Sequence, residues 1–350
     1  MDMVNVEDCC EILDSMRVPI TASERKEGKY PYYGANGIQD YVDDYIFDDE
    51  LVLLAEDGGN FGSRERPIAY RISGKCWVNN HAHVLKPKKG LDVDYLCYSL
   101  MFYKVEGIVN GATRKKLTQA AMRKMQIPFR RMEEQIHIVN NLNYVLKVKE
   151  KRERKLKLLD ELVRGRFVEL FGHPENNEMN WPQYCFGDIC TVRQGLQIPI
   201  SKRLTETEEN CYEYITVAYL HGGKEREYIK DPKDSVICHE DDILMTRTGN
   251  TGMVVTDVEG VFHNNFFLID FDRNRFSKGF LVEYLNLDYI QADILRRAGT
   301  STIPDLNHGD FYKMKIYEPP IALQKEFEAF SRQIDKSKFG HLSMLTTIKS

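Results

Sequence analysis

Residues 131–171 read RMEEQIHIVNNLNYVLKVKEKRERKLKLLDELVRGRFVELF. Leucine, lysine, glutamate and arginine dominate this stretch, which contains no proline and a single glycine, Gly165. Such residues favour helix. The apolar residues recur mostly at spacings of three and four, as in the heptads of a coiled coil; they are Val139, Leu142, Leu146, Leu156, Val163, Phe167 and Leu170. The stretch therefore predicts one helix of about 40 residues, roughly 60 Å long.

A helix of this kind needs a partner. Residues 147–155 are almost wholly charged, and a long helix that is polar over much of its surface is not stable alone in water. A second helical stretch begins near Ile321, directly after two prolines, and carries Phe327, Phe330 and Ile334 at the same spacing. We expect the two helices to pack together. The alternative is a long helix lying on the flank of one domain.

The composition is that of an ordinary globular protein. A length of 350 residues suggests about two domains. The net charge of −5 and the pI of about 6.0 argue mildly against a protein that coats DNA by itself, but they allow a local basic face. The acidic N-terminus is unlike a signal peptide, and no run of 18 apolar residues is present. We therefore expect a cytoplasmic protein whose eight cysteines are reduced thiols.

Segments of the first half recur in the same order in the second half. Gln135 and Gln324 close the series at an offset of 189 residues. The matched segments are Val6–Ile20 with Phe186–Ile200, Asp48–Gly62 with Glu240–Gly252, Val78–Leu85 with His263–Asp270, and Lys116–Phe129 with Asp305–Glu318. This order predicts two copies of one unit, each a globular domain followed by a helix. The alternative is a chance similarity of weak motifs.

The expected fold class is α+β. Each copy shows short strand-like runs separated by glycine-rich turns, without the strand–helix alternation of a doubly wound sheet. The expected domains are residues 1–130 and 173–319, with a central helix over 131–172 and a distal helix over 320–350. Among the expected elements are strands at Glu50–Ala55, Ala69–Ile72, Trp77–Leu85, Tyr214–Ala218, Ile243–Thr246, Met253–Val258 and Phe266–Phe271, and helices at Val93–Tyr103 and Gly279–Arg297.

Two glycine–asparagine turns are the first candidates for binding. GGNFGSRER and TRTGNTG follow equivalent strands and combine backbone amides with side chains suited to phosphates and base edges. The candidate residues are Asn60, Ser63, Arg64 and Arg66 in the first copy, and Arg247, Thr248, Asn250 and Thr251 in the second. Either turn alone could equally be a plain hairpin.

A basic stretch is the second candidate. Residues 111–131 contain seven lysines or arginines and no acidic residue, a pattern that can neutralise phosphates. Arg114, Lys115 and Lys116 are its candidate phosphate contacts. The alternative is a solvated helix face. The corresponding stretch of the second copy, residues 299–315, is far less basic and offers Thr302 as a candidate, so the two copies should not bind identically.

Motifs of enzyme active sites and metal sites are weak in this sequence. Cys185 and Cys190 lack a second pair at zinc-site spacing, and His81 and His83 are interpreted as one face of a strand. Neither a phosphate-binding P-loop nor a nucleophile-elbow motif is present. We expect a chain without a metal, a cofactor or catalytic chemistry of its own. An enzyme with an unrecognised active site is the disfavoured alternative.

Four motifs together resemble the specificity subunit of type I restriction–modification enzymes. They are YPYYGANGI (30–38), KLKLLDELVRGRFVELFG (155–172), WPQYCFGDICTVRQG (181–195) and AGTSTIPDLNHGDF (298–311). The resemblance implies two target recognition domains separated by helices that form an antiparallel coiled coil. Each domain would read one half of a bipartite site in double-stranded DNA, and the helices would set the gap between the halves.

The resemblance also implies partners. Two methyltransferase subunits would dock on the helices and bring S-adenosylmethionine, and restriction subunits would bring ATP and Mg²⁺. The docking candidates are Leu142, Leu146, Leu156, Val163, Phe167, Phe327, Phe330 and Ile334. One departure is the distal helix, which lacks a counterpart of residues 162–171, so the coiled coil should be truncated. The alternatives are a helical scaffold and a silent or recombining specificity cassette.

Overall fold

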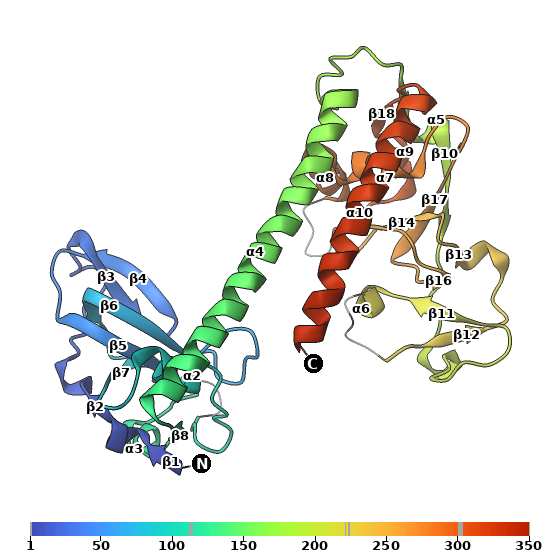
Figure 1. Cartoon of the computed structure of the whole chain (residues 1–350). Coiled ribbons are helices and arrows are strands. Elements are labelled where there is room, and N and C mark those ends of the chain that lie inside the picture. Colours follow the sequence, from blue (N-terminus) through green and yellow to red (C-terminus); the bar gives the residue numbers. More distant parts are fainter. Residues whose placement is uncertain (1, 112–114, 221, 223–224, 300–303, 350) are drawn as a thin grey trace. The chain divides into compact units, whose positions relative to one another are not determined.

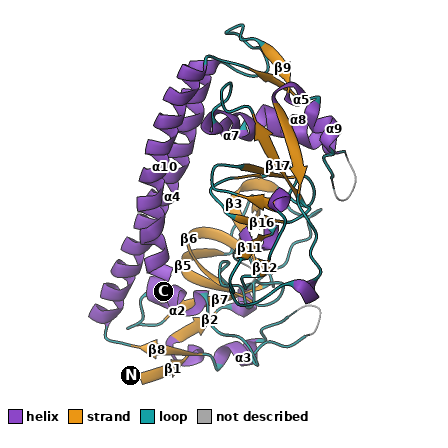
Figure 2. Cartoon of the chain, turned by 90° about the vertical axis from the view of Figure 1, so that its right-hand side faces the viewer, coloured by secondary structure: helices purple, strands orange, loops and turns teal. Residues whose placement is uncertain are grey.

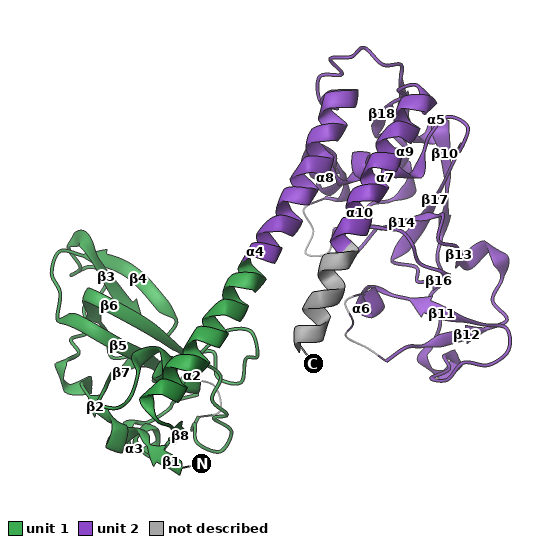
Figure 3. Ribbon diagram, viewed as in Figure 1, with its two compact units in different colours: residues 1–150 green, residues 151–350 purple. Residues whose placement is uncertain are grey.

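The computed structural model describes residues 2–111, 115–220, 222, 225–299 and 304–349, with side chains of the last helix described as far as Lys338. The chain forms two compact units, residues 1–150 and 151–350, shown in green and purple in Figure 3. The central helix is shared between them, so its first half belongs to unit 1 and its second half to unit 2.

The predicted pair of long helices is present. Helix α4 spans Met132–Phe171 and helix α10 spans Ile321–Lys349. Arg166 pairs with Glu326 at 3.0 Å and Asp160 pairs with Lys338 at 2.9 Å. Residue numbers therefore rise along one helix as they fall along the other, which makes the pair antiparallel (Figures 1 and 2).

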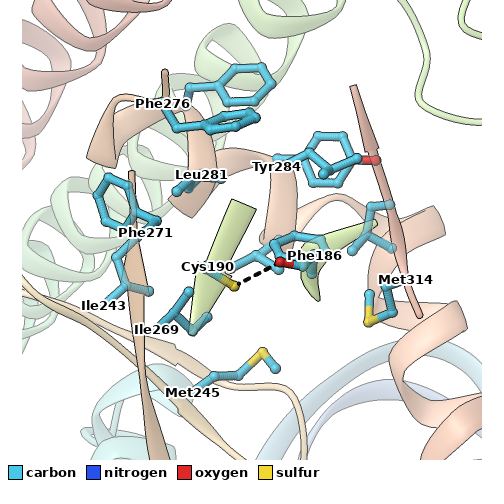
Figure 4. Packing of buried hydrophobic residues seen from close by; sticks show 14 of the residues in the cluster. Phe186, Cys190, Ile243, Met245, Ile269, Phe271, Phe276, Leu281, Tyr284 and Met314 are labelled. Atoms are coloured by element: carbon cyan, nitrogen blue, oxygen red, sulfur yellow. Dashed lines mark hydrogen bonds between the residues drawn. The ribbon is translucent and has the colours of Figure 1, made fainter. Parts of the chain in front are cut away.

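Aromatic rings join this helix pair to unit 2. Phe167 lies 4.8 Å from Phe171, 5.4 Å from Phe280 and 5.3 Å from Phe327, measured between ring centroids. All four rings are fully buried. Phe280 belongs to α7, so three helices meet here. The same core continues to Phe186, whose carbonyl accepts a hydrogen bond from the Cys190 thiol (Figure 4).

Unit 1 is built on a six-stranded sheet in the order β2-β7-β5-β6-β3-β4, and a two-stranded sheet pairs β1 with β8. The strands are β1 (Asp2–Asn5), β2 (Cys10–Ile12), β3 (Glu27–Gly34), β4 (Gly37–Val42), β5 (Phe47–Ala55), β6 (Ala69–Val78), β7 (Ala82–Pro87) and β8 (Gln126–Phe129). The helices are α1 (Val6–Cys9), η1 (Asp14–Met16), α2 (Val93–Met101) and α3 (Gln119–Arg123).

Unit 2 repeats this plan with the large sheet divided. Its sheets run β10-β17-β14-β15, β12-β11-β16-β13 and β18-β9. The strands are β9 (Gln183–Cys185), β10 (Cys190–Gln194), β11 (Cys211–Ile215), β12 (Tyr228–Lys230), β13 (Ile237–Cys238), β14 (Ile243–Thr246), β15 (Val254–Val255), β16 (Gly260–Phe262), β17 (Phe266–Phe271) and β18 (Lys315–Tyr317). The helices are α5 (Phe186–Ile189), η2 (Ile200–Lys202), α6 (Val217–Leu220), η3 (Asp234–Val236), α7 (Lys278–Asn286), α8 (Asp288–Ala298) and α9 (His308–Tyr312).

Two buried glutamines confirm the repeat at atomic detail. The side-chain oxygen of Gln135 accepts the backbone N–H of Asp92, the residue that caps α2. The side-chain oxygen of Gln324 likewise accepts the backbone N–H of Ser277, which caps α7. Both glutamines are fully buried and also donate to two backbone carbonyls. Each copy therefore attaches its long helix to its globular part with the same hydrogen bonds.

Four expected elements differ from the structure. The run expected as a strand over Met253–Val258 is a strand only at Val254–Val255. The run expected as one strand over Trp77–Leu85 is broken by a turn in which Asn79 accepts the N–H of His81. The helix expected over Gly279–Arg297 is two helices, because Leu287 between them has an extended backbone. The run expected as a strand over Tyr214–Ala218 ends at Ile215 and is followed by α6. In the described part of the chain, the helices are all too short or too polar to cross a bilayer.

Candidate nucleic-acid interface

In unit 1, the turn after β5 lies against the segment that precedes α3. Leu117 donates its backbone N–H to the carbonyl of Glu56 at 2.7 Å, and Asp57 and Lys116 form an isolated antiparallel bridge. The Lys116 ammonium also lies 3.0 Å from the Glu56 carboxylate. The glycine-rich turn and the basic stretch, two separate predictions from the sequence, therefore meet in the structure.

Unit 2 builds the same pair of loops with other side chains. Leu306 donates its N–H to the carbonyl of Arg247 at 2.9 Å, and Thr248 bridges to Asp305. The guanidinium of Arg247 holds the Asp305 carboxylate through two hydrogen bonds of 2.9 and 2.8 Å. Such a bidentate pair fixes the orientation of both partners. The same backbone contact between two loops is thus present in each unit. A Lys116–Glu56 ion pair joins the loops of unit 1, and an Arg247–Asp305 ion pair joins the loops of unit 2.

The structure separates the candidates of the first turn by exposure. Ser63 accepts the N–H of Arg66 at 2.9 Å, and Asn60 donates to the carbonyl of Pro67 at 3.4 Å. These two polar groups shape the turn itself. Arg64 and Arg66 are exposed, so their guanidinium groups are the parts of this turn that a phosphate or a base edge can reach.

The candidates of the second turn are held more tightly. Thr251 donates its hydroxyl to the carbonyl of Pro304 at 2.8 Å, and Thr248 is half-buried. Asn250 is exposed. Arg247, predicted to read bases, has a side chain only 21% exposed and is occupied by Asp305. In this structure Arg247 locks the two loops together.

The basic stretch places Lys115 and Lys116 at the surface, the latter with its ammonium on Glu56. Two further candidates, Arg114 and Thr302, lie outside the described residues. Sequence reasoning gave no role to Glu56 or Asp305. The signal that could have found them is their position, because each lies in a segment that the repeat aligns.

A buried polar cluster backs the loops of unit 1. Asp14, Glu56 and His83 bring ligand-type atoms within 4.8 Å of one another. Arg17 and Lys116 already pair with the two carboxylates, so we assign no metal here. His83 lies in strand β7 as expected, with its ring fully buried and hydrogen-bonded on both sides, whereas His81 precedes the strand.

The docking candidates on the helices fall into two groups. Leu142 and Leu146 are 39% and 48% exposed, and Leu156 is half-buried. In contrast, Val163, Phe167 and Phe327 are buried in the core of unit 2, where Phe330 and Ile334 pack against them. The buried side chains join the two helices to their own unit and do not face a second chain directly.

Two copies of one α+β unit, each presenting a loop pair and each followed by a long helix, define a class of duplicated recognition proteins. The sequence matches the family described as type I restriction modification DNA specificity domain over residues 1–159 and 178–339, one match for each copy. The chain belongs to this family.

Relatives carry the same description. A Haemophilus influenzae protein assigned as a type I restriction enzyme specificity subunit, S.HindORF215P, is 37% identical over 138 residues, 39% of this chain and 35% of that protein. The Escherichia coli EcoprrI specificity subunit is 26% identical over 117 residues, 33% of this chain and 28% of that protein. The matched region thus spans about a third of the length of these relatives.

Solved structures show the same fold. The S subunit of a type I restriction–modification system from M. genitalium superposes with a TM-score of 0.63 at 16% identity, covering 99% of this chain and 92% of that one. A chain from a study of complex assembly and conformational transition of the type I R-M system gives 0.55 at 14% identity, covering 99% and 94%. The likeness confirms the predicted architecture of two duplicated units and an antiparallel helix pair.

Proposed function

We propose that this chain reads DNA sequence as the specificity subunit of a type I restriction–modification enzyme. The observation that carries the proposal is the loop pair built twice with different side chains. Because the backbones of the two loop pairs are equivalent, both loop pairs would lie on DNA in the same way. Because their side chains differ, they would make different hydrogen bonds to base edges. The target would then be bipartite and asymmetric, with one half read by each unit.

The rest of the enzyme is proposed to come from partners. Methyltransferase subunits would supply S-adenosylmethionine for adenine methylation, and restriction subunits would supply ATP- and Mg²⁺-dependent cleavage. The chain itself would direct these reactions in the cytoplasm without catalysing them. A net charge of −5 fits this division, since partner subunits can complete the positively charged surface that encloses the DNA.

The exposed leucines of α4 support docking on the helix. Leu142 and Leu146 lie one helical turn apart on the same face of α4 and are 39% and 48% exposed. Apolar side chains in such a row are suited to a partner that covers them. We propose that methyltransferase subunits do so.

The test is a methylation assay on a library of randomised DNA sites. The chain is assembled with its methyltransferase, and methylated molecules are sequenced; the methyltransferase without the chain is the control. The proposal expects two specified blocks separated by an unspecified gap, only when the chain is present. A complex that assembles but methylates all sequences alike would show instead that the chain is a scaffold.

A further inference from the structure

The ring of His83 occupies a buried position between two segments of unit 1. It belongs to β7 and is 0% exposed. Its Nδ1 lies 2.7 Å from a carboxylate oxygen of Asp14, and its Nε2 lies 2.9 Å from the carbonyl oxygen of Leu117. The ring therefore connects the turn after β2 to the segment that precedes α3.

Both ring nitrogens face hydrogen-bond acceptors. The carbonyl of Leu117 can only accept, and the Asp14 carboxylate also accepts from the Val84 N–H and from Gln119, each at 2.9 Å. Burial would raise the pKa of Asp14, but the hydrogen bonds from His83, Val84 and Gln119 outweigh it and hold that pKa below its usual value. Asp14 is thus a carboxylate, so both nitrogens of His83 must donate. A ring that donates from both nitrogens is an imidazolium.

The surrounding charges come from three further segments. Glu56, after β5, lies 3.7 Å from the His83 ring. Arg17, after η1, reaches Glu56 at 2.7 Å and Asp14 at 3.5 Å, and Lys116 reaches Glu56 at 3.0 Å. Burial would raise the pKa of Glu56, but Arg17 and Lys116 hold it below its usual value. The imidazolium therefore lies among two carboxylates and two cations.

This network fixes one residue from both sides. Leu117 accepts from His83 through its carbonyl and donates to Glu56 through its N–H. Lys115 and Lys116, the described candidates for phosphate contact, directly precede it in the chain. The orientation of these lysines against the turn after β5 depends on how firmly Leu117 is held.

The second copy fills the same place with an aromatic ring. Ala55 pairs with Ala82 at the ends of β5 and β7, and Thr246 pairs with Phe266 at the equivalent ends of β14 and β17. His83 therefore matches Phe267, one residue away from Leu268, which the sequence alignment set against it. Phe267 is fully buried and packs against Phe311 and His308 at 5.0 and 5.6 Å. Burial, with a contribution from Arg247, lowers the pKa of His308.

We propose that His83 is a positioning group that holds the loop pair of unit 1, and that unit 1 reads its half-site fully only while both ring nitrogens donate. The inference rests on the proposed function. Loss of either donation removes the His83 hydrogen bond to Asp14 or to Leu117, and a hydrogen bond to a charged group contributes strongly enough that about a tenfold effect is expected. Unit 2 lacks this dependence because its equivalent position is Phe267.

The test measures discrimination at each half-site in the methylation assay, with the assembled complex. His83→Leu, which removes both N–H donors, should lower discrimination in one half about tenfold, while the other half stays at the wild-type value. His83→Gln offers one donor nitrogen and an acceptor oxygen, so it cannot donate to Asp14 and Leu117 from opposite sides, and its discrimination in that half should also be low. His137→Gln, an exposed histidine of α4, is the matched control and should retain the wild-type discrimination.

Two further readouts separate the possible failures. Nitrogen NMR of the wild-type chain should show both ring nitrogens of His83 protonated at pH 6, a measurement that does not need a folded variant. A singly protonated ring there, or His83 variants in which discrimination falls equally in both halves, would overturn the inference. Absence of any bipartite pattern in the wild-type chain would instead overturn the proposed function.

Discussion

Replacement of Phe167 by alanine tests how the long helices are held to unit 2. The ring is fully buried and contacts Phe171, Phe280 and Phe327 at centroid distances of 4.8 to 5.4 Å. A buried Phe→Ala change costs about 3–5 kcal/mol in unfolding free energy, and this ring lies at the upper part of that range because it loses three aromatic partners. With a urea slope of about 2 kcal/mol/M, a loss of about 4 kcal/mol lowers the unfolding midpoint by about 2 M.

The chain provides an assay for each unit, because each contains one of its two tryptophans. Trp181 donates its indole N–H to the carbonyl of Phe171 at 3.1 Å, next to the aromatic cluster. Trp77 lies in β6 of unit 1. In a Trp77→Phe background the fluorescence follows unit 2, and in a Trp181→Phe background it follows unit 1.

Phe167→Ala should shift the Trp181 transition by about 2 M and leave the Trp77 transition in place. Leu158→Ala on the same helix is the control: its side chain is 53% exposed, so it should cost at most about 0.5–1 kcal/mol. Equal shifts of both transitions would refute the division into two units, and a shift no larger than that of the control would refute the role of the aromatic cluster.

Three other predictions concern charged groups. Burial raises the pKa of Glu283 above its ordinary value of 4.5, so ionisation of this carboxyl group destabilises unit 2 as the pH rises above 4.5. Glu283→Gln should therefore raise the urea midpoint of unit 2 at pH 7. This gain should vanish below pH 4.5, where the wild-type carboxyl group is protonated. Arg247→Ala and Asp305→Ala should relax the same half of the DNA site equally if the pair only locks the loops, whereas a larger effect of Arg247→Ala in the methylation assay would show that its guanidinium also reads a base. Lys115→Ala should reduce the salt dependence of DNA binding by about one charge unit. Lys116→Ala should reduce it less, because Glu56 already pairs with the Lys116 ammonium. Equal changes in the salt dependence for the two variants would contradict this assignment.

The long helices and the repeat could be predicted because their signals are local. α4 begins at Met132, one residue from the start of the quoted stretch, and ends at Phe171 as expected. Its many apolar and charged residues at helical spacing all favour the same structure. Gln135 and Gln324 could be matched by sequence alone, although their hydrogen bonds to the helix caps could not be foreseen.

The hairpin of β3 and β4 was missed for a local reason. Pro31 lies inside β3 and weakens a strand assignment. The turn residues Gly34 and Gly37, between two tyrosine-bearing runs, were the signal that favoured it. The one-strand expectation over residues 77–85 failed because Asn79 accepts the N–H of His81, a side-chain contact that competes with the strand.

The charge network of unit 1 could not be predicted because it joins residues far apart in the chain. His83 contacts Asp14 and Leu117, which are 69 and 34 residues away. The residue pattern shows only a histidine between Ala82 and Val84. Similarly, the Arg247–Asp305 pair spans 58 residues, so the sequence could suggest Arg247 for base contact but could not show that the side chain is already engaged.

Sequencing of methylated adenines in cells that carry this chain and its methyltransferase tests the central claim most directly. Two units with equivalent frames and different side chains predict an asymmetric motif of two specified blocks separated by an unspecified gap. The double variant Arg64→Ala, Arg66→Ala removes the exposed cations of the first turn. It should reduce sequence specificity in one block of the motif and leave the other block unchanged. A continuous or palindromic motif, or a variant that blurs both blocks alike, would contradict the assignment of one half-site to each unit.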